Sequence, residues 1–152
     1  MISVESGLTV LSKKATKSPS SLTRYLQKFQ VGFFSFQPFK SLFVKDVETK
    51  FVFDPSFFGG ETIIIKGIDD YMEYIKASGS LFRSSQHLIG NLLISESGNS
   101  VKVKSNLNSR GYYKDDINRS VSLWGYYETY LKKINGHWKI IRHDFYSLGA
   151  EE

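Results

Sequence analysis

The chain has 152 residues, of which 41% are hydrophobic and 15% aromatic, enough for a single domain with a substantial core. It has no cysteine, so disulfides, thiolate metal sites and cysteine nucleophiles are excluded. The net charge of +5 comes from residues 1–40, which hold six basic residues and one acidic residue, and the remainder is neutral. A nucleic-acid surface needs positive charge clustered on the folded body, so no nucleic-acid partner is expected.

Residues 1–19 are rich in Ser, Thr and Lys, and they predict a flexible basic extension ahead of a single domain over residues 20–152. A mitochondrial presequence is the alternative, although such presequences prefer arginine to the lysines found here. No apolar run is long enough to span a membrane, and no secretory signal pattern is present. We therefore expect no membrane contact and a cytoplasmic location.

The first half of the chain predicts helices around two strands. A helix is expected after Ser20 or Ser21, with an apolar stripe formed by Leu22, Tyr25, Leu26 and Phe29. Pro38 suits the start of a second short helix over Phe39–Val44. Alternating side chains predict strands over Asp46–Asp54 and Thr62–Ile65, and Asp69 or Asp70 is expected to cap the helix that follows.

The second half predicts four antiparallel strands, over Phe82–Ser95, Val101–Leu107, Ser122–Ile134 and His137–Phe145. Asn135-Gly136 separates the last two and favours a type I′ hairpin turn, because that turn needs positive φ at both central positions. A loop over Asn108–Arg119 and a tail over Leu148–Glu152 complete the order. Helices cluster first and strands last, which indicates an α+β fold rather than a parallel sheet.

Strict alternation assigns each strand two faces. In Phe82–Ser95 it places His87, Ile89, Asn91 and Leu93 together. In the first hairpin arm it places Tyr127 and Thr129 opposite an aromatic stripe of Trp124, Tyr126 and Tyr130. In the second arm it places Trp138, Ile140, Arg142 and Asp144 on one face and Lys139, Ile141, His143 and Phe145 on the other.

Several short motifs resemble the nuclear transport factor 2-like superfamily, in its polyketide-cyclase (SnoaL-like) and scytalone dehydratase-like branch. Ser-Ser-Gln-His at 84–87, followed by Leu-Ile-Gly, resembles the Thr-Gln-His-Phe-Ile-Gly strand of scytalone dehydratases. Tyr113-Lys114-Asp115 resembles their Arg-Tyr-Lys-Asp loop, and Tyr130–Ile140 resembles their final hairpin. The likeness covers roughly residues 20–148, and the strand with Gln86 and His87 points to the dehydratase branch.

The resemblance implies a cone-shaped fold, in which N-terminal helices pack on a strongly curved sheet around a central small-molecule pocket. It also implies chemistry without a metal or organic cofactor, with His87 at the position of a general acid/base that eliminates water. Other family positions are substituted. The catalytic Asp falls near Gly32, a water-positioning Tyr near Phe51, a second His near Arg110, and a polar Ser and Asn near Gly125 and Tyr127. The same mechanism and substrate as in scytalone dehydratases are therefore not expected.

His87 is the candidate catalytic residue, because a neutral imidazole can take up a proton near pH 7. Asp46, Asp54 and Asp144 are the carboxylates that could reach its second nitrogen, and the plainer reading is a buried structural histidine. Candidate substrate-binding residues are Phe51, Phe53, Asn91, Arg110 and Tyr127. Arg110 could hold an anion, although an exposed loop arginine is the commoner case. The three histidines lack metal-ligand spacing, so no metal site is predicted.

The leading hypothesis is a lyase (dehydratase) or isomerase acting on a small hydrophobic cyclic or aromatic molecule, with His87 moving the proton. Whether the chain is an enzyme stays open, because a non-catalytic ligand-binding or assembly domain of the same fold is the alternative. A transport adaptor is a third reading, and it would need an exposed apolar patch. The aromatic stripe of Trp124, Tyr126 and Tyr130 suits a homo-oligomer, dimer or trimer, formed through the sheet. Packing against the first helix is the equally plain use of that stripe.

Overall fold

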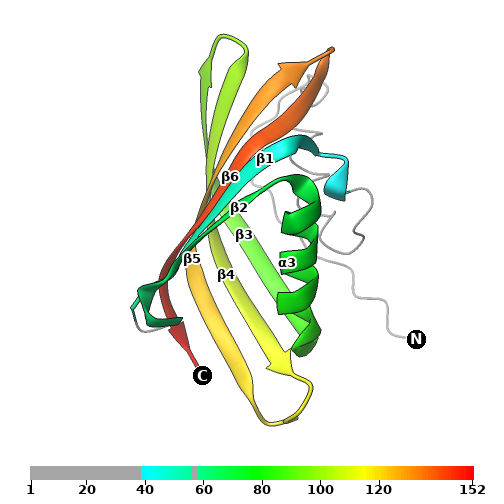
Figure 1. Cartoon of the computed structure of the whole chain (residues 1–152). Helices are drawn as coiled ribbons and strands as arrows, with labels where there is room; N and C mark the ends of the chain where they lie inside the picture. The colour runs from blue at the N-terminus through cyan, green and yellow to red at the C-terminus, as the bar shows by residue number, and fades with distance from the viewer. Residues whose placement is uncertain (1–38, 56–57) are drawn as a thin grey trace, which may run out of the picture.

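The fold is described from a computed structural model, which places residues 39–55 and 58–152 (Figure 1). Its complete elements are one helix, six strands and a short 3₁₀ turn, η2 (Phe58–Gly60), and Phe39 and Lys40 are helical as well. The helix is α3 (Ile68–Ser80). The strands are β1 (Phe43–Val52), β2 (Thr62–Lys66), β3 (Phe82–Ser97), β4 (Ser100–Tyr113), β5 (Ser120–Ile134) and β6 (His137–Glu151).

The six strands form one sheet in the order β2-β1-β6-β5-β4-β3. All neighbours are antiparallel except β1 and β6, which pair in parallel. The sheet is curved, and α3 lies on its concave side, where Ile68, Tyr71 and Met72 are buried against strand side chains (Figure 1). This arrangement confirms the predicted α+β fold with a curved, mostly antiparallel sheet.

The hairpin turn between β5 and β6 is confirmed, because Asn135 and Gly136 both have positive φ, 49° and 79°. The predicted alternation of faces along β6 holds on each side of Ile141 but not across it. Tyr130 pairs with Arg142 but Leu131 pairs with Ile140, so Ile141 is an extra residue in a β-bulge. Ile140 is therefore buried on the concave side, whereas strict alternation would have placed it with Arg142 and Asp144.

β3 carries a similar bulge. Gly90 pairs with Asn106 and Leu93 pairs with Lys104, so two residues of β3, Asn91 and Leu92, oppose the single residue between those partners. Asn91 has φ 53°, the left-handed region that asparagine tolerates better than most residues. The prediction that Leu93 shares the face of His87 is wrong, because the bulge moves Leu93 to the convex face.

The predicted boundaries need three further corrections. The short helix over Phe39–Val44 is wrong beyond its first residues, because Phe43 and Val44 already belong to β1. The loop over Asn108–Arg119 is wrong in its first half, since β4 continues to Tyr113. The predicted tail is the end of β6, where Leu148 to Glu151 pair along β5 or bulge from it.

The start of α3 also differs from expectation. Its N-cap is Gly67, and no side chain makes a capping hydrogen bond, so Asp69 and Asp70 lie inside the first turn. There they stabilise the helix through its dipole, and Asp69 also pairs with Lys40. The predicted helix after Ser20 and the boundary at residue 20 lie outside the described residues. Within residues 39–55 and 58–152, no helix is long and apolar enough to cross a membrane.

Candidate functional site

The concave face of the sheet carries two apolar clusters in succession. The first lies under α3 and includes Tyr71, Leu131 and Ile140. The second lies beyond it and consists of Phe53, Leu107, Tyr127 and Phe145, with Phe51, Ile63, Ile89 and Leu123 packed against them. Three of the predicted site residues, Phe51, Phe53 and Tyr127, therefore come together in one aromatic group.

The aromatic group draws on three strands that are far apart in sequence. Phe51 pairs with Phe145 across the parallel β1–β6 contact, and Phe145 pairs with Tyr127 across β6 and β5. The Phe51 and Phe53 rings stack at a centroid separation of 6.3 Å, and the Tyr127 and Phe145 rings lie 5.3 Å apart. The result is a wall of aromatic rings on the concave side.

Tyr127 supplies the polar atom of this wall. Its side chain is buried, and the loss of hydration raises the pKa of its phenol well above the ordinary value. The phenol therefore keeps its proton at any physiological pH. It can donate a hydrogen bond to a negatively charged oxygen, and it cannot act as a base.

His143 is a buried residue that sequence reasoning did not select. Its ring stacks on Tyr127 with centroids 4.6 Å apart and planes 22° apart, and its Nδ1 shares a 2.9 Å hydrogen bond with Thr129 Oγ1. Burial lowers the pKa of His143 to about 3, so the ring is neutral. Strand alternation placed His143 with Phe145 but also with the charged Lys139, so alternation alone did not predict its burial.

His87 lies on the concave face, in the edge strand β3. It pairs with Ser109, two residues along β4 from the buried Leu107, and Ile89 beside it packs on the aromatic cluster. The ring is exposed to solvent, yet the protein atoms around it remove part of its hydration and lower the pKa of the imidazole below its usual value. Its neutral form therefore dominates at pH 7.

His87 and Tyr127 flank one patch of the concave face. Ser109, the partner of His87, and Ser105, the partner of Tyr127, are four residues apart on β4. That spacing is about 13 Å along the strand, and His87 and Tyr127 also lie two strands apart, about 10 Å across the sheet, with Leu107 between the two serines. A ligand lying over Leu107 would meet His87 at one end and Tyr127 at the other.

Arg110 and Asn91 do not join this group. Arg110 pairs with Gln86 and Ser122 on the convex face, where its guanidinium donates a 3.1 Å hydrogen bond to Ser120 Oγ and lies over the Tyr112 ring. Asn91 lies exposed in the β3 bulge. Asp144, one of the carboxylates considered for His87, also lies on the convex face and cannot reach it.

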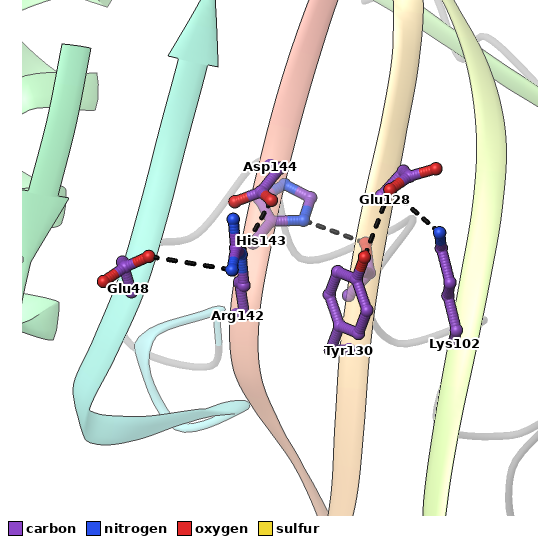
Figure 2. A network of polar contacts seen from close by, with 8 residues as sticks. Glu48, Lys102, Glu128, Tyr130, Arg142, His143 and Asp144 are labelled. Carbon is purple, nitrogen blue, oxygen red and sulfur yellow. Dashed lines mark hydrogen bonds and ion pairs between the residues drawn. The ribbon is translucent and has the colours of Figure 1, made fainter. Parts of the chain in front are cut away.

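The convex face carries a polar network instead (Figure 2). Arg142 Nε lies 2.7 Å from Asp144 Oδ2, and a second guanidinium nitrogen lies 3.9 Å from Glu48. On the next strands, Lys102 pairs with Glu128 at 2.9 Å. The aromatic stripe is on this face, where Tyr126 stacks on Tyr146 at 5.0 Å, and the first helix, against which it could alternatively pack, lies outside the described residues.

The same architecture occurs in solved structures. A protein from Kribbella flavida matches 87% of this chain and 91% of its own length, with a TM-score of 0.71 and 12% identity. A putative scytalone dehydratase from Novosphingobium aromaticivorans matches 86% of this chain and 84% of its own, with a TM-score of 0.66 and 20% identity. A hexachlorocyclohexane dehydrochlorinase from Novosphingobium barchaimii matches 86% of both chains, with a TM-score of 0.69 and 13% identity.

These structural neighbours share the fold of this chain, a helix packed on a curved, mostly antiparallel sheet. Residues 22–144 match the SnoaL-like domain family, which is most of the chain. The chain belongs to that family. No curated protein sequence matches it closely enough to count as a relative.

Proposed function

We propose that this protein is a cofactor-independent lyase or isomerase acting on a small hydrophobic cyclic molecule bound on the concave face. The observation that carries the proposal is the placement of a neutral imidazole, His87, and a permanently protonated phenol, Tyr127, on either side of an apolar patch with an aromatic wall. One group can accept a proton and the other can donate a hydrogen bond.

His87 is the proposed general base. A base in proton abstraction must be unprotonated, and the lowered pKa of His87 keeps it so at pH 7. His87 would take a proton from a substrate carbon that lies next to a carbonyl group or next to the carbon that carries a leaving group. In an elimination the electrons of that C–H bond form the new double bond as the leaving group departs, and in an isomerisation the proton returns at another carbon.

Tyr127 is the proposed stabiliser of negative charge. Abstraction next to a carbonyl moves charge onto the carbonyl oxygen, and a buried donor stabilises that oxygen more than water would. Phe51, Phe53 and Phe145 would hold the substrate ring through apolar and edge-to-face contacts. The dehydratase and the dehydrochlorinase among the structural neighbours are both named for eliminations, which supports the lyase direction.

A non-catalytic ligand-binding domain of the same fold is the second candidate. It is favoured by Gly125 and Tyr127, which stand where the scytalone dehydratases have a polar Ser and Asn. The position of the family's helix carboxylate, near Gly32, lies outside the described residues. This second candidate predicts tight binding of apolar ring compounds with no turnover.

The deciding experiment is a turnover and binding screen with cyclic hydroxyketones, phenolic ketones and halogenated rings. We expect turnover of at least one compound, loss of kcat by 100-fold or so in His87→Gln, and a smaller loss in Tyr127→Phe. Arg110→Gln is the matched control, because Arg110 lies on the convex face. Turnover that survives His87→Gln unchanged would contradict the proposed base, and binding without turnover would establish the second candidate.

A further inference from the structure

The edge strand β3 is unusually open. It is 16 residues long, and it pairs with β4 on one side while its other side ends the sheet among the described residues. The free side of an edge strand presents a row of backbone N–H and C=O groups that can accept another strand. Most β3 side chains are exposed, so neither face of the strand is well covered.

Large apolar side chains line this exposed edge. Leu88 is 59% exposed and Leu93 is 67% exposed, both on the convex face, and Leu92 and Ile94 are also open to solvent. Edge strands are commonly protected by lysine, proline or short length. Phe82–Ser97 contains no lysine and no proline, and its charged residues are Arg83 near one end and Glu96 near the other.

The bulge makes the two halves of β3 complementary to each other. Before it, even-numbered residues such as Gln86 and Leu88 face the convex side; after it, odd-numbered residues such as Leu93 and Ser95 do. Two copies paired antiparallel must match convex residues with convex residues. A register that pairs the half before the bulge with the half after it achieves this only by joining even to odd numbers.

We propose that β3 pairs antiparallel with β3 of a second copy of this chain, with Leu88 opposite Leu93 of the second copy. The same register places Gln86 opposite Ser95 on the convex face and His87 opposite Ile94 on the concave face. Two leucine pairs, related by a two-fold axis near Gly90, lose their exposure. The antiparallel direction also brings the Arg83 end of each strand to the Glu96 end of the other, so opposite charges meet at both ends.

The pairing would change the environment of His87. Directly opposite residues on neighbouring antiparallel strands have Cβ atoms about 5 Å apart, so Ile94 of the second copy would lie beside the His87 ring. The partner would thus complete the rim of the candidate site. This consequence rests on the proposed function, whereas the pairing itself rests on β3 alone, and the two are tested by separate measurements.

The oligomeric state tests the pairing first. We expect the full chain to be dimeric by light scattering and sedimentation. Leu93→Lys should raise the dimer dissociation constant by about tenfold or more, because it places a charge against Leu88 in each half of the interface. Ile64→Lys is the matched control, since Ile64 is 57% exposed in the same cross-sheet row but on β2, at the opposite edge. A monomeric chain, or equal effects of the two variants, would overturn the proposal.

Cysteine pairing tests the register without disturbing the fold, because the chain has no cysteine of its own. A mixture of Leu88→Cys and Leu93→Cys chains should form a disulfide-linked heterodimer, while neither variant should cross-link alone. A mixture of Leu88→Cys with Ile94→Cys is the control, because these side chains face opposite sides of the sheet. A dimer in which the first mixture gives no more cross-link than the control would contradict this register, whatever the outcome of the activity screen.

Discussion

The Thr129 hydroxyl and the His143 imidazole share a hydrogen bond of 2.9 Å in the buried centre of the sheet. On the other side of His143, Thr49 of β1 is its parallel-strand partner, and the Thr49 hydroxyl is buried without a hydrogen bond to any described residue. The three residues form one row across β1, β6 and β5. This row separates the core under α3 from the aromatic wall of the candidate site.

The burial of His143 predicts acid-sensitive stability. Its pKa is about 3 when folded and near 6.5 when unfolded, so between these values the unfolded chain binds more protons and stability falls as the pH falls. We expect a loss of about 2 kcal/mol between pH 7 and pH 5, measured by urea unfolding at one protein concentration.

His143→Gln is the control for this acid sensitivity. The substitution should remove most of the pH dependence of the free energy of unfolding. The part that remains comes from His87, whose lowered pKa also makes stability fall as the pH falls. The raised pKa of Asp144 acts with the opposite sign, and Asp144→Asn in both backgrounds removes it. An unchanged slope in His143→Gln would show that His143 titrates normally.

A pH–rate profile is the second prediction, measured on any substrate found in the screen. Because His87 must be neutral to accept a proton, kcat/KM should fall as the pH drops through a value below 6.5. His143 cannot supply a limb in this range, since its pKa is about 3. A limb that persists in an active His87→Gln variant would assign the base to another residue.

Gly125 is required by a close backbone approach. A Cβ at this position would lie 2.2 Å from the Tyr146 carbonyl oxygen and 3.0 Å from Phe145 Cε2. Gly125→Ala should therefore destabilise the fold by about 2 kcal/mol or more in urea unfolding. Gly79→Ala in α3 is the control, because nothing lies within 4 Å of its Cβ. It should be neutral or stabilising by up to about 1 kcal/mol, and equal effects of the two changes would refute the steric argument.

Arg142 is predicted to stabilise a buried carboxylate. The Asp144 side chain is only 1% exposed, and its pKa is raised by burial although Arg142 pulls it down. Arg142→Met should cost about 2 kcal/mol at pH 7, and adding Asp144→Asn should recover part of that loss. Arg119→Met is the comparison, because its partner Glu152 is 52% exposed, and it should cost clearly less than Arg142→Met. Equal losses would show that Asp144 is well hydrated.

Local patterns in the sequence were sufficient for most of the elements. Alternation located β1, β2, β3 and β5 to within a few residues and found the start of β6 but not its end, and Asn135-Gly136 predicted the last hairpin. These features depend on neighbours along the chain, through side-chain alternation and turn geometry. The α+β class followed from the order of elements, and the family resemblance supplied the curvature of the sheet.

The tertiary structure alone decided which side chains share the site. The bulges at Asn91 and Ile141 reverse the face of every residue beyond them, and a bulge is set by the pairing of two strands rather than by one strand's own pattern. The parallel contact of β1 with β6 joins segments about ninety residues apart, and it buries His143 and assembles the aromatic wall. Arg110 lies outside the candidate site because β4 continues through Tyr113, and this pairing places Arg110 on the convex face.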